Sequence, residues 1–184
     1  MDCTSCKRGV LKPSYIEGQF RAHTCSHCKG DWILIEDFIA WRERNPGYEF
    51  AENATLTLDA SETKKAMLCP QSGVIMRKFR ISAAHDHRVD YSAAVGGIWL
   101  DHGEWELLKA EGLAISVGGV VTEQWQHKVR EQSAKQSFTD LYVSKFGEED
   151  YQKVKALREW ILSHPQKADL RAFLLAEDPY SAEK

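Results

Sequence analysis

Four cysteines near the start of the chain form two pairs with the same internal spacing, Cys3-x2-Cys6 and Cys25-x2-Cys28. Each pair is expected to form a tight turn that points both sulfurs to one side and presents backbone amides to the thiolates. Two such turns supply the four soft ligands that tetrahedral Zn²⁺ prefers, and the spacing is that of a zinc ribbon. We therefore predict one Zn²⁺ per chain, held by Cys3, Cys6, Cys25 and Cys28. Because four thiolates fill the coordination sphere, the site is predicted to be structural, and no catalytic residue is assigned.

Two other roles for these side chains fit the pattern less well. A thioredoxin-type redox motif has one Cys-x-x-Cys pair at the start of a helix, whereas this chain has two pairs in predicted turns. His23 and His27 flank the second pair and could replace one cysteine as a ligand. We expect both histidines instead to be exposed ribbon residues near the metal.

A later part of the chain, residues 67–111, repeats the first 44 residues. Cys69-x2-Ser72 aligns with the first cysteine pair at an offset of 66 residues, and the second pair aligns at an offset of 67. Only Cys69 keeps its sulfur, and the other three ligand positions hold Ser72, Ser92 and Val95. We therefore predict that the second repeat binds no metal. Cys69 is then expected to be a half-buried thiol without a chemical role.

Both repeats resemble the transcription-factor-IIB-type zinc-finger family of small, largely prokaryotic proteins. In the first repeat the resemblance rests on the four cysteines together with Gly30 and Trp32. In the second it rests on the segment Gly96-Gly97-Ile98-Trp99-Leu100-Asp101-x-Gly103-Glu104. The resemblance covers residues 1–44 and 67–111 and implies two tandem zinc-ribbon copies, the second degenerate. It implies a fold and does not establish a transcriptional role.

The elements that must position these residues are two short strands and a helix in each repeat. The predicted strands span residues 10–16, 19–24, 74–81 and 87–91, and the predicted helices span residues 33–44 and 102–111. The first hairpin should turn near Glu17-Gly18. The second helix is expected to begin with a capping box, in which Asp101 is the N-cap and Glu104 follows three residues later.

The rest of the chain is predicted to contain a linker and a helical region. Residues 45–66 are polar and rich in turn-forming residues, whereas residues 114–184 contain apolar residues at helical spacing. One helix is expected over residues 122–146, a second up to Pro165 and a third around Phe173. The predicted fold class is α+β. It comprises a zinc ribbon with closing helix (residues 1–44), a linker (45–66), a degenerate ribbon-like repeat with closing helix (67–113) and a helical region (114–184).

A rival metal site could be formed by His85, Asp86 and His87, with His102 nearby in sequence. A metal held by these residues would keep open positions and would make a hydrolytic site conceivable. We favour the alternative that the three residues form the polar tip of the second hairpin, because no fixed spacing links them to a known ligand set.

Composition and charge favour a protein partner. The formal charge of the 184 residues is −3, so no global positive field attracts nucleic acid or a membrane. The basic cluster of residues 77–80 is expected to be divided between the two faces of a strand. No apolar stretch approaches the roughly 20 residues that span a bilayer, and the N-terminus lacks a signal-peptide core, so we expect a cytoplasmic protein.

We therefore predict a zinc-stabilised, non-catalytic adaptor protein that binds an unidentified protein partner, with Trp41 or Trp125 as a candidate anchor. A nucleic-acid-binding regulator that uses the ribbon surfaces is the alternative. A metal-dependent hydrolase that uses His85, Asp86 and His87 is a more distant one.

Overall fold

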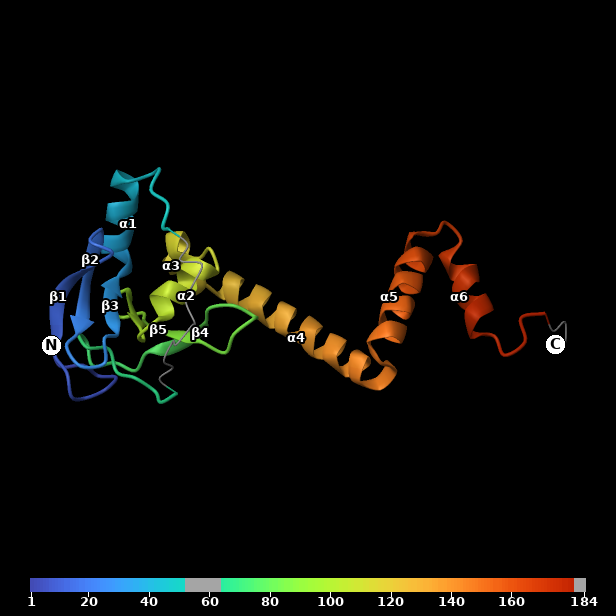
Figure 1. The fold of residues 1–184 in the computed structure, drawn as a ribbon, viewed down its shortest axis with the longest axis horizontal. Coiled ribbons are helices and arrows are strands. Elements are labelled where there is room, and N and C mark those ends of the chain that lie inside the picture. The colour runs from blue at the N-terminus through green and yellow to red at the C-terminus, as the bar shows by residue number, and fades with distance from the viewer. Residues whose placement is uncertain (52–63, 181–184) are drawn as a thin grey trace. The chain divides into compact units, whose positions relative to one another are not determined.

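The computed structural model describes residues 1–51 and 64–180 (Figure 1). Residues 52–63 of the predicted linker and residues 181–184 of the predicted helical region lie outside the described residues. The chain divides into two compact units, Met1–Ser133 and Ala134–Lys184, which are considered one at a time. Across the described residues the protein has a six-stranded antiparallel sheet and six α-helices, and the predicted α+β class is confirmed.

The first repeat forms three strands and a helix, namely β1 (Leu11–Ile16), β2 (Phe20–Cys25), β3 (Asp31–Leu34) and α1 (Ile35–Arg44). Buried Phe20 and Ala22 alternate with exposed Arg21 along β2, as expected for a strand with one face on a core. Residues 17–19 connect β1 to β2, and Glu17 and Gly18 have φ angles of 49° and 70°. Two consecutive positive φ angles match the tight hairpin turn whose twist suits paired strands.

The second repeat has the same order, with β4 (Arg77–Arg80), β5 (Arg88–Ser92), β6 (Gly97–Leu100) and α2 (Glu104–Ala110). The predicted capping box is only half formed. The Asp101 amide donates to Glu104 Oε2 at 2.8 Å, but Asp101 Oδ1 accepts from the Trp99 indole N–H at 2.8 Å instead of capping the helix. The burial of that indole explains the difference, because its N–H needs a partner.

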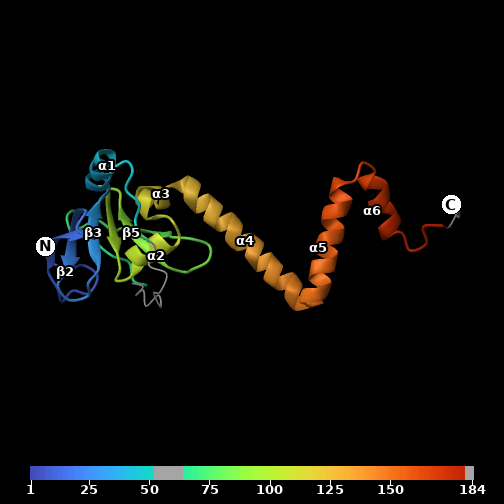
Figure 2. The ribbon, with the colours of Figure 1, turned by 45° about the horizontal axis from the view of Figure 1, so that its top comes forward.

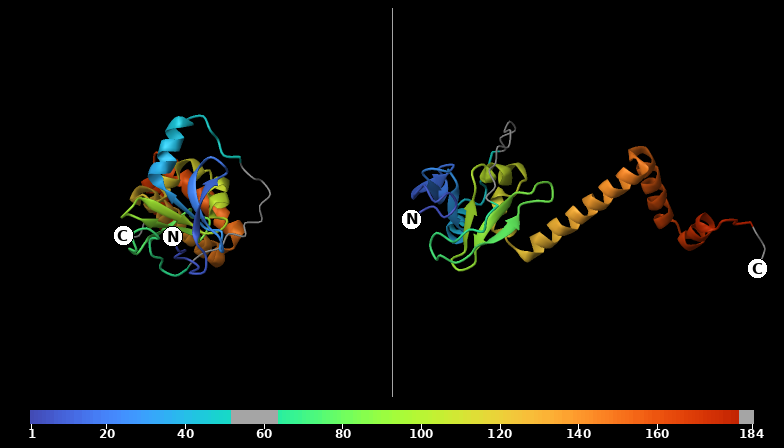
Figure 3. Two further views of the ribbon diagram at one scale, coloured as in Figure 1. Left: turned by 90° about the vertical axis from the view of Figure 1, so that its left-hand side faces the viewer. Right: turned by 90° about the horizontal axis from the view of Figure 1, so that it is seen from below.

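All six strands belong to one antiparallel sheet with the order β1-β2-β3-β6-β5-β4. Strands from the two repeats lie side by side in this sheet (Figure 3). At its centre β3 pairs with β6, and Trp32 lies opposite Trp99. These tryptophans are also equivalent positions of the two repeats, so an approximate two-fold axis passes between them, perpendicular to the sheet. The prediction of two strands per repeat is therefore wrong by one. The third strands were missed because each finds its partner in the other repeat, about 67 residues away along the chain.

Two glycines permit this central pairing. A Cβ on Gly97 would overlap Cζ2 and Cη2 of the Trp32 ring and lie 3.0 Å from its Cε2. By the same symmetry, a Cβ on Gly30 would overlap Cζ2 of Trp99 and lie 2.9 Å from the carbonyl oxygen of Leu100. Each tryptophan therefore rests on a glycine of the other repeat, and both rings are fully buried.

The two faces of the sheet bury different sets of side chains. On one face, Ile33, Ile98 and Leu100 belong to the main core, which also includes residues of α1, α2 and the short helix α3 (Val117–Val120) (Figure 2). On the other face, Trp32 and Trp99 pack in a second cluster with buried cysteines. The sheet thus separates a conventional core from the sulfur-rich region.

An aromatic cluster closes the main core beside α1. The Trp41 ring lies 5.5 Å from the Phe20 ring and 5.5 Å from that of Phe50, between centroids. Phe50 comes from the segment predicted as a linker, and its ring also packs edge-on against Trp105. Because Trp41 is only 7% exposed, it is a core residue and not a free anchor for a partner.

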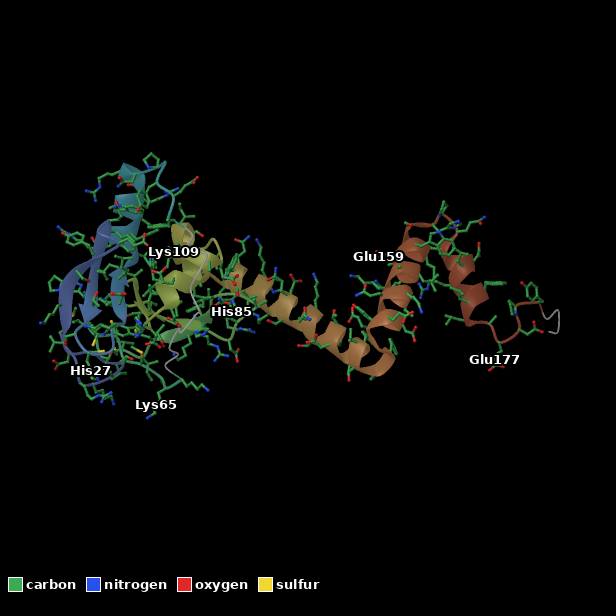
Figure 4. The ribbon with its side chains drawn as sticks, in the orientation of Figure 1. His27, Lys65, His85, Lys109, Glu159 and Glu177 are labelled. Carbon is green, nitrogen blue, oxygen red and sulfur yellow. The ribbon has the colours of Figure 1, made fainter. Side chains whose placement is uncertain are left out.

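The hairpin turn of the first repeat is tied to α2 of the second. Glu17 Oε1 accepts from the Trp105 indole N–H at 3.2 Å and from the Lys109 ammonium group, which also pairs with Glu106 at 2.7 Å. Burial lowers the pKa of Lys109, but the hydrogen bonds that its ammonium group donates to Glu106 and Glu17 raise it more, so the pKa lies above the usual 10.5. A buried, charged lysine therefore joins the two repeats (Lys109 in Figure 4).

The first unit ends with a 3₁₀ turn (Ala114–Ser116), α3 and the beginning of α4 (Glu123–Phe146). The side-chain amide of Gln126 lies along the edge strand β4, accepting from the Arg80 amide at 3.2 Å and donating to the Arg80 carbonyl at 2.8 Å. Trp125 is half-buried, and its indole N–H donates to the Ile81 carbonyl at 2.9 Å, so this second candidate anchor is also engaged internally. These contacts cover an edge that would otherwise offer unpaired backbone groups.

The second unit is helical and consists of the remainder of α4, α5 (Glu148–Ser163) and α6 (Lys167–Leu175), close to the predicted helices. Helices α5 and α6 pack against each other, and the Thr139 and Tyr151 hydroxyls lie 3.3 Å apart between α4 and α5. Among its described residues only Ile161 is buried, although each helix has an apolar stripe.

Candidate metal centre

The first cysteine pair lies in a tight loop before β1. The Cys3 amide donates to the Gly9 carbonyl at 2.9 Å, and the Lys7 amide donates back to the Cys3 carbonyl at 3.0 Å. Lys7 has a φ of 55°, which turns the chain away after the pair, and the Cys6 amide lies 3.5 Å from Cys3 Sγ. This is the amide-to-sulfur turn expected from the spacing.

The second pair has the same geometry at the end of β2. The Cys25 amide donates to the Gly30 carbonyl at 2.8 Å, and Lys29, the residue after the pair, has a φ of 62°. The amides of His27 and Cys28 lie 3.4 Å and 3.5 Å from Cys25 Sγ. The two turns are therefore alike in backbone conformation and in how they present their sulfurs.

The two turns bring the four predicted ligands together. All four sulfurs lie within 4.8 Å of one another, and the Cys3–Cys28 and Cys6–Cys25 sulfur pairs are each 3.7 Å apart. Cys3 and Cys25 are buried, whereas Cys6 and Cys28 are partly exposed. Such a group could bind a metal ion, and it is the only group of this kind within residues 1–51 and 64–180.

The thiols strongly influence one another. Burial is the main cause that raises the pKa of Cys3 to about 11 and moves that of Cys28 further in the same direction. For Cys6, burial is outweighed by hydrogen bonds from backbone amides and from neighbouring cysteines, which lower its pKa to about 6. Four adjacent sulfurs therefore do not ionise together without a cation, and a bound metal would release their protons.

One residue that supports the centre was missed by sequence reasoning. A Cβ on Gly9 would overlap Cys25 Sγ and would lie 2.9 Å from the Cβ of His27. Gly9 accordingly lets the loop of the first pair approach the second. The only sequence signal was a glycine three residues after a Cys-x-x-Cys pair.

The flanking histidines contribute no ligand atom to this group. His27 is exposed on the second turn, as predicted (Figure 4). His23 is half-buried in β2, where it pairs with Trp32 of β3, so the expectation of an exposed residue is wrong for His23. Its position on β2, which is flanked by β1 and β3, explains the difference.

The second repeat keeps both turns but only one of the four cysteines. The Cys69 amide donates to the Val74 carbonyl at 2.8 Å, and the Gly73 amide donates to the Cys69 carbonyl at 2.9 Å, as in the first turn. Gly73 and Gly96 have φ angles of 69° and 63° at the positions equivalent to Lys7 and Lys29. The loop after Cys69 is one residue shorter than the loop after Cys3, and the β4–β5 hairpin is two residues longer than the β1–β2 hairpin. Together these two changes give the difference of one residue between the two alignment offsets.

Cys69 differs from its prediction in one respect. It is 1% exposed, and therefore fully buried where a half-buried thiol was expected, because it packs in the cluster that contains Met67, Met76 and Trp99. Burial raises the pKa of Cys69, but hydrogen bonds from the Ser72 side chain and other nearby groups lower it more, so the net shift is downward.

The rival histidine site is dispersed in the structure. His85 Nε2 lies 2.9 Å from Glu111 Oε1, whereas His87 Nδ1 lies 3.9 Å from the buried Glu104. The Asp86 side chain is 87% exposed, and His102 is also exposed. Within the described residues these side chains form no three-ligand group.

The basic cluster of residues 77–80 is occupied by internal contacts. Arg77 pairs with Glu123 at 2.9 Å and Lys78 with Asp90 at 2.7 Å. Arg80 donates to the Ser133 hydroxyl and to the His85 carbonyl, both at 2.9 Å. These contacts hold α4 and the second hairpin to β4, and they leave little charge for a phosphate backbone.

Comparison with known proteins gives no further assignment: no family model matches the chain, and no curated protein or solved structure is significantly similar to it. None of the helices in the described part of the chain is long and apolar enough to cross a membrane.

Proposed function

We propose that the protein is a zinc-stabilised, non-catalytic adaptor of the cytoplasm that binds a protein partner. The cluster of four sulfurs carries this proposal. Tetrahedral coordination with Zn–S bonds of about 2.3 Å requires sulfurs about 3.8 Å apart. The Cys3–Cys28 and Cys6–Cys25 sulfur pairs are each 3.7 Å apart, and all four sulfurs lie within 4.8 Å of one another. A reducing compartment keeps such thiols available for metal.

The role of zinc in this proposal is to hold the two turns together. The turns are short loops with few apolar side chains of their own, and their cysteines pack in the cluster that contains the buried Trp32 and Trp99. Four thiolates leave no coordination position for water or substrate, which favours a structural over a catalytic metal.

The surface near the metal supports a binding role. Val10, Leu68 and Ile75 are 46%, 48% and 65% exposed at this end of the sheet, and the bridge between Leu68 and Ile75 places two of them together. A groove of about 510 Å³ lies between the loops and is lined by Val10 and Leu68 together with Lys7 and Arg8. Exposed apolar side chains with a charged rim are typical of protein-binding surfaces.

Metal analysis of the purified full chain tests the metal assignment. We expect one zinc per chain in the wild type, loss of zinc in Cys25→Ser, and one zinc per chain in Cys69→Ala. Two zinc ions per chain, a different metal, or zinc retained in Cys25→Ser would contradict the assignment.

Affinity capture with the full chain as bait tests the binding surface. Ile75→Asp is expected to lose the partner, whereas Ile39→Asp should retain it, because Ile39 is a similarly exposed aliphatic residue (50%) on α1, away from the metal. Equal recovery with both variants would exclude this end of the sheet.

A nucleic-acid-binding regulator is the second candidate, favoured by Lys7, Arg8, Lys64 and Lys65, which are exposed at the same end of the protein (Lys65 in Figure 4). Binding to random DNA that weakens steeply with added salt would support this candidate. Absence of binding at low salt would eliminate it.

A further inference from the structure

The helical unit leaves most of its apolar side chains exposed. Ile161 is its only buried residue within positions 134–180. Large side chains on all three helices, and Tyr180 after α6, are between 43% and 84% exposed: Phe138, Leu141, Tyr142, Phe146, Val154, Leu157, Trp160, Leu162, Phe173, Leu174, Leu175 and Tyr180. A unit of this size gains too little from a single buried residue to offset the conformational entropy of folding.

The exposed area matches what a stable interface requires. An aromatic side chain can bury about 150–250 Å², so the exposed parts of the six aromatic residues in this set alone amount to roughly 600 Å². A stable protein–protein interface buries about 800 Å² on each partner. Together with the exposed aliphatic residues, the unit therefore presents enough apolar surface for a permanent interface, and permanent interfaces are the more apolar ones.

The charges of α5 indicate what covers this surface. Asp150, Val154, Leu157 and Arg158 lie on one face of α5, at helical spacings of three, four and eight residues. If a second α5 runs antiparallel and the two helices cross at Val154, Asp150 of each helix lies opposite Arg158 of the other. Leu157 then lies opposite Tyr151. The same arrangement opposes the two helix dipoles favourably.

We propose that the helical unit pairs with a second copy of this chain through an antiparallel contact between the two α5 helices, centred on Val154. A contact of this type is self-complementary, because one charged pair of residues serves both sides of the axis. Arg158 is in no ion pair among the described residues, and Asp150 has only the exposed Lys153 at 3.3 Å, so both are available to the second copy. This proposal does not depend on the metal or on the adaptor role.

The mass of the metal-loaded full chain in solution tests the proposal. Light scattering and analytical ultracentrifugation should give a dimer of 42 kDa, twice the 21.0 kDa of the chain. Arg158→Asp should raise the dimer dissociation constant about tenfold or more, because it creates two repulsive pairs with Asp150. Asp150→Arg should do the same, and the double variant Asp150→Arg with Arg158→Asp should restore the dimer.

Controls make each outcome decisive. Glu159→Lys changes the same amount of charge on the opposite side of α5 from Val154 and should leave the dimer intact. Retained helicity and zinc content show that each variant is folded, and they separate this test from that of the metal. A monomeric wild type, or a dimer that is insensitive to both single charge reversals, would overturn the proposal. So would a monomer that sediments with anionic phospholipid vesicles, because the apolar surface would then belong to a membrane.

Discussion

The close contact of each central tryptophan with a glycine makes Gly97→Ala the most informative single substitution. The added methyl group would overlap two atoms of the Trp32 ring and lie 3.0 Å from a third. The ring is completely buried against the sulfur cluster, so it cannot move without displacing the turns that carry the cysteines. Overpacking of a close-packed core typically costs 1–3 kcal/mol, and we expect a loss of about 3 kcal/mol in the free energy of unfolding.

Urea denaturation of the zinc-loaded full chain, followed by tryptophan fluorescence, measures this loss. Gly47→Ala is the matched control, because nothing lies within 4 Å of its added Cβ, and it should change stability by less than about 0.5 kcal/mol. Trp32→Leu removes the overlapping ring atoms, so the cost of Gly97→Ala should largely disappear in that background. A Gly97→Ala protein as stable as the wild type would refute the packing of Trp32 on the second repeat.

Three further predictions concern the support of the first unit. In the same urea titration, Gln126→Ala should lower the free energy of unfolding by about 2 kcal/mol, because the backbone of Arg80 loses its hydrogen-bond partners at the sheet edge. Its control, Gln124→Ala on the exposed face of α4, should have no measurable effect. The raised pKa of Lys109 means that its charge stabilises the fold fully below pH 10.5 and that this contribution is lost as the pH rises through the folded pKa. Stability measured above pH 10.5 should therefore fall more steeply in the wild type and in the exposed-site control Lys128→Met than in Lys109→Met, and parallel curves would contradict the ion pairs with Glu17 and Glu106. Gly9→Ala should lower the affinity for zinc about tenfold, measured in competition with a chelator, because the added methyl group would displace Cys25 Sγ. An unchanged affinity would exclude the close approach of the two turns.

The sequence was sufficient where the determining interactions are local. Cysteine spacing predicted which sulfurs come together, and the helical periodicity beyond residue 122 predicted α4, α5 and α6 closely. Each of these features depends on residues a few positions apart, which is the range over which turn and helix patterns operate.

Interactions between the repeats could not be predicted in this way. The third strands have too few residues for a clear alternating pattern, and β3 is specified by β6 far along the chain. Asp101 had the type and position of an N-cap, but the buried Trp99 indole uses its carboxylate. The same holds for Trp41, whose burial depends on Phe50 from a segment that looked like a linker.

The intact turns of the second repeat have a consequence for protein engineering. Since Cys69, Gly73 and Gly96 already occupy a backbone shaped for sulfur ligands, the second repeat is a ready host for a new metal centre. Three exchanges of single side chains, Ser72→Cys, Ser92→Cys and Val95→Cys, would complete a set of four sulfurs without inserting or deleting a residue. Because the second repeat keeps the backbone of both turns but has lost three cysteines, cysteine spacing alone does not reveal that the architecture is duplicated.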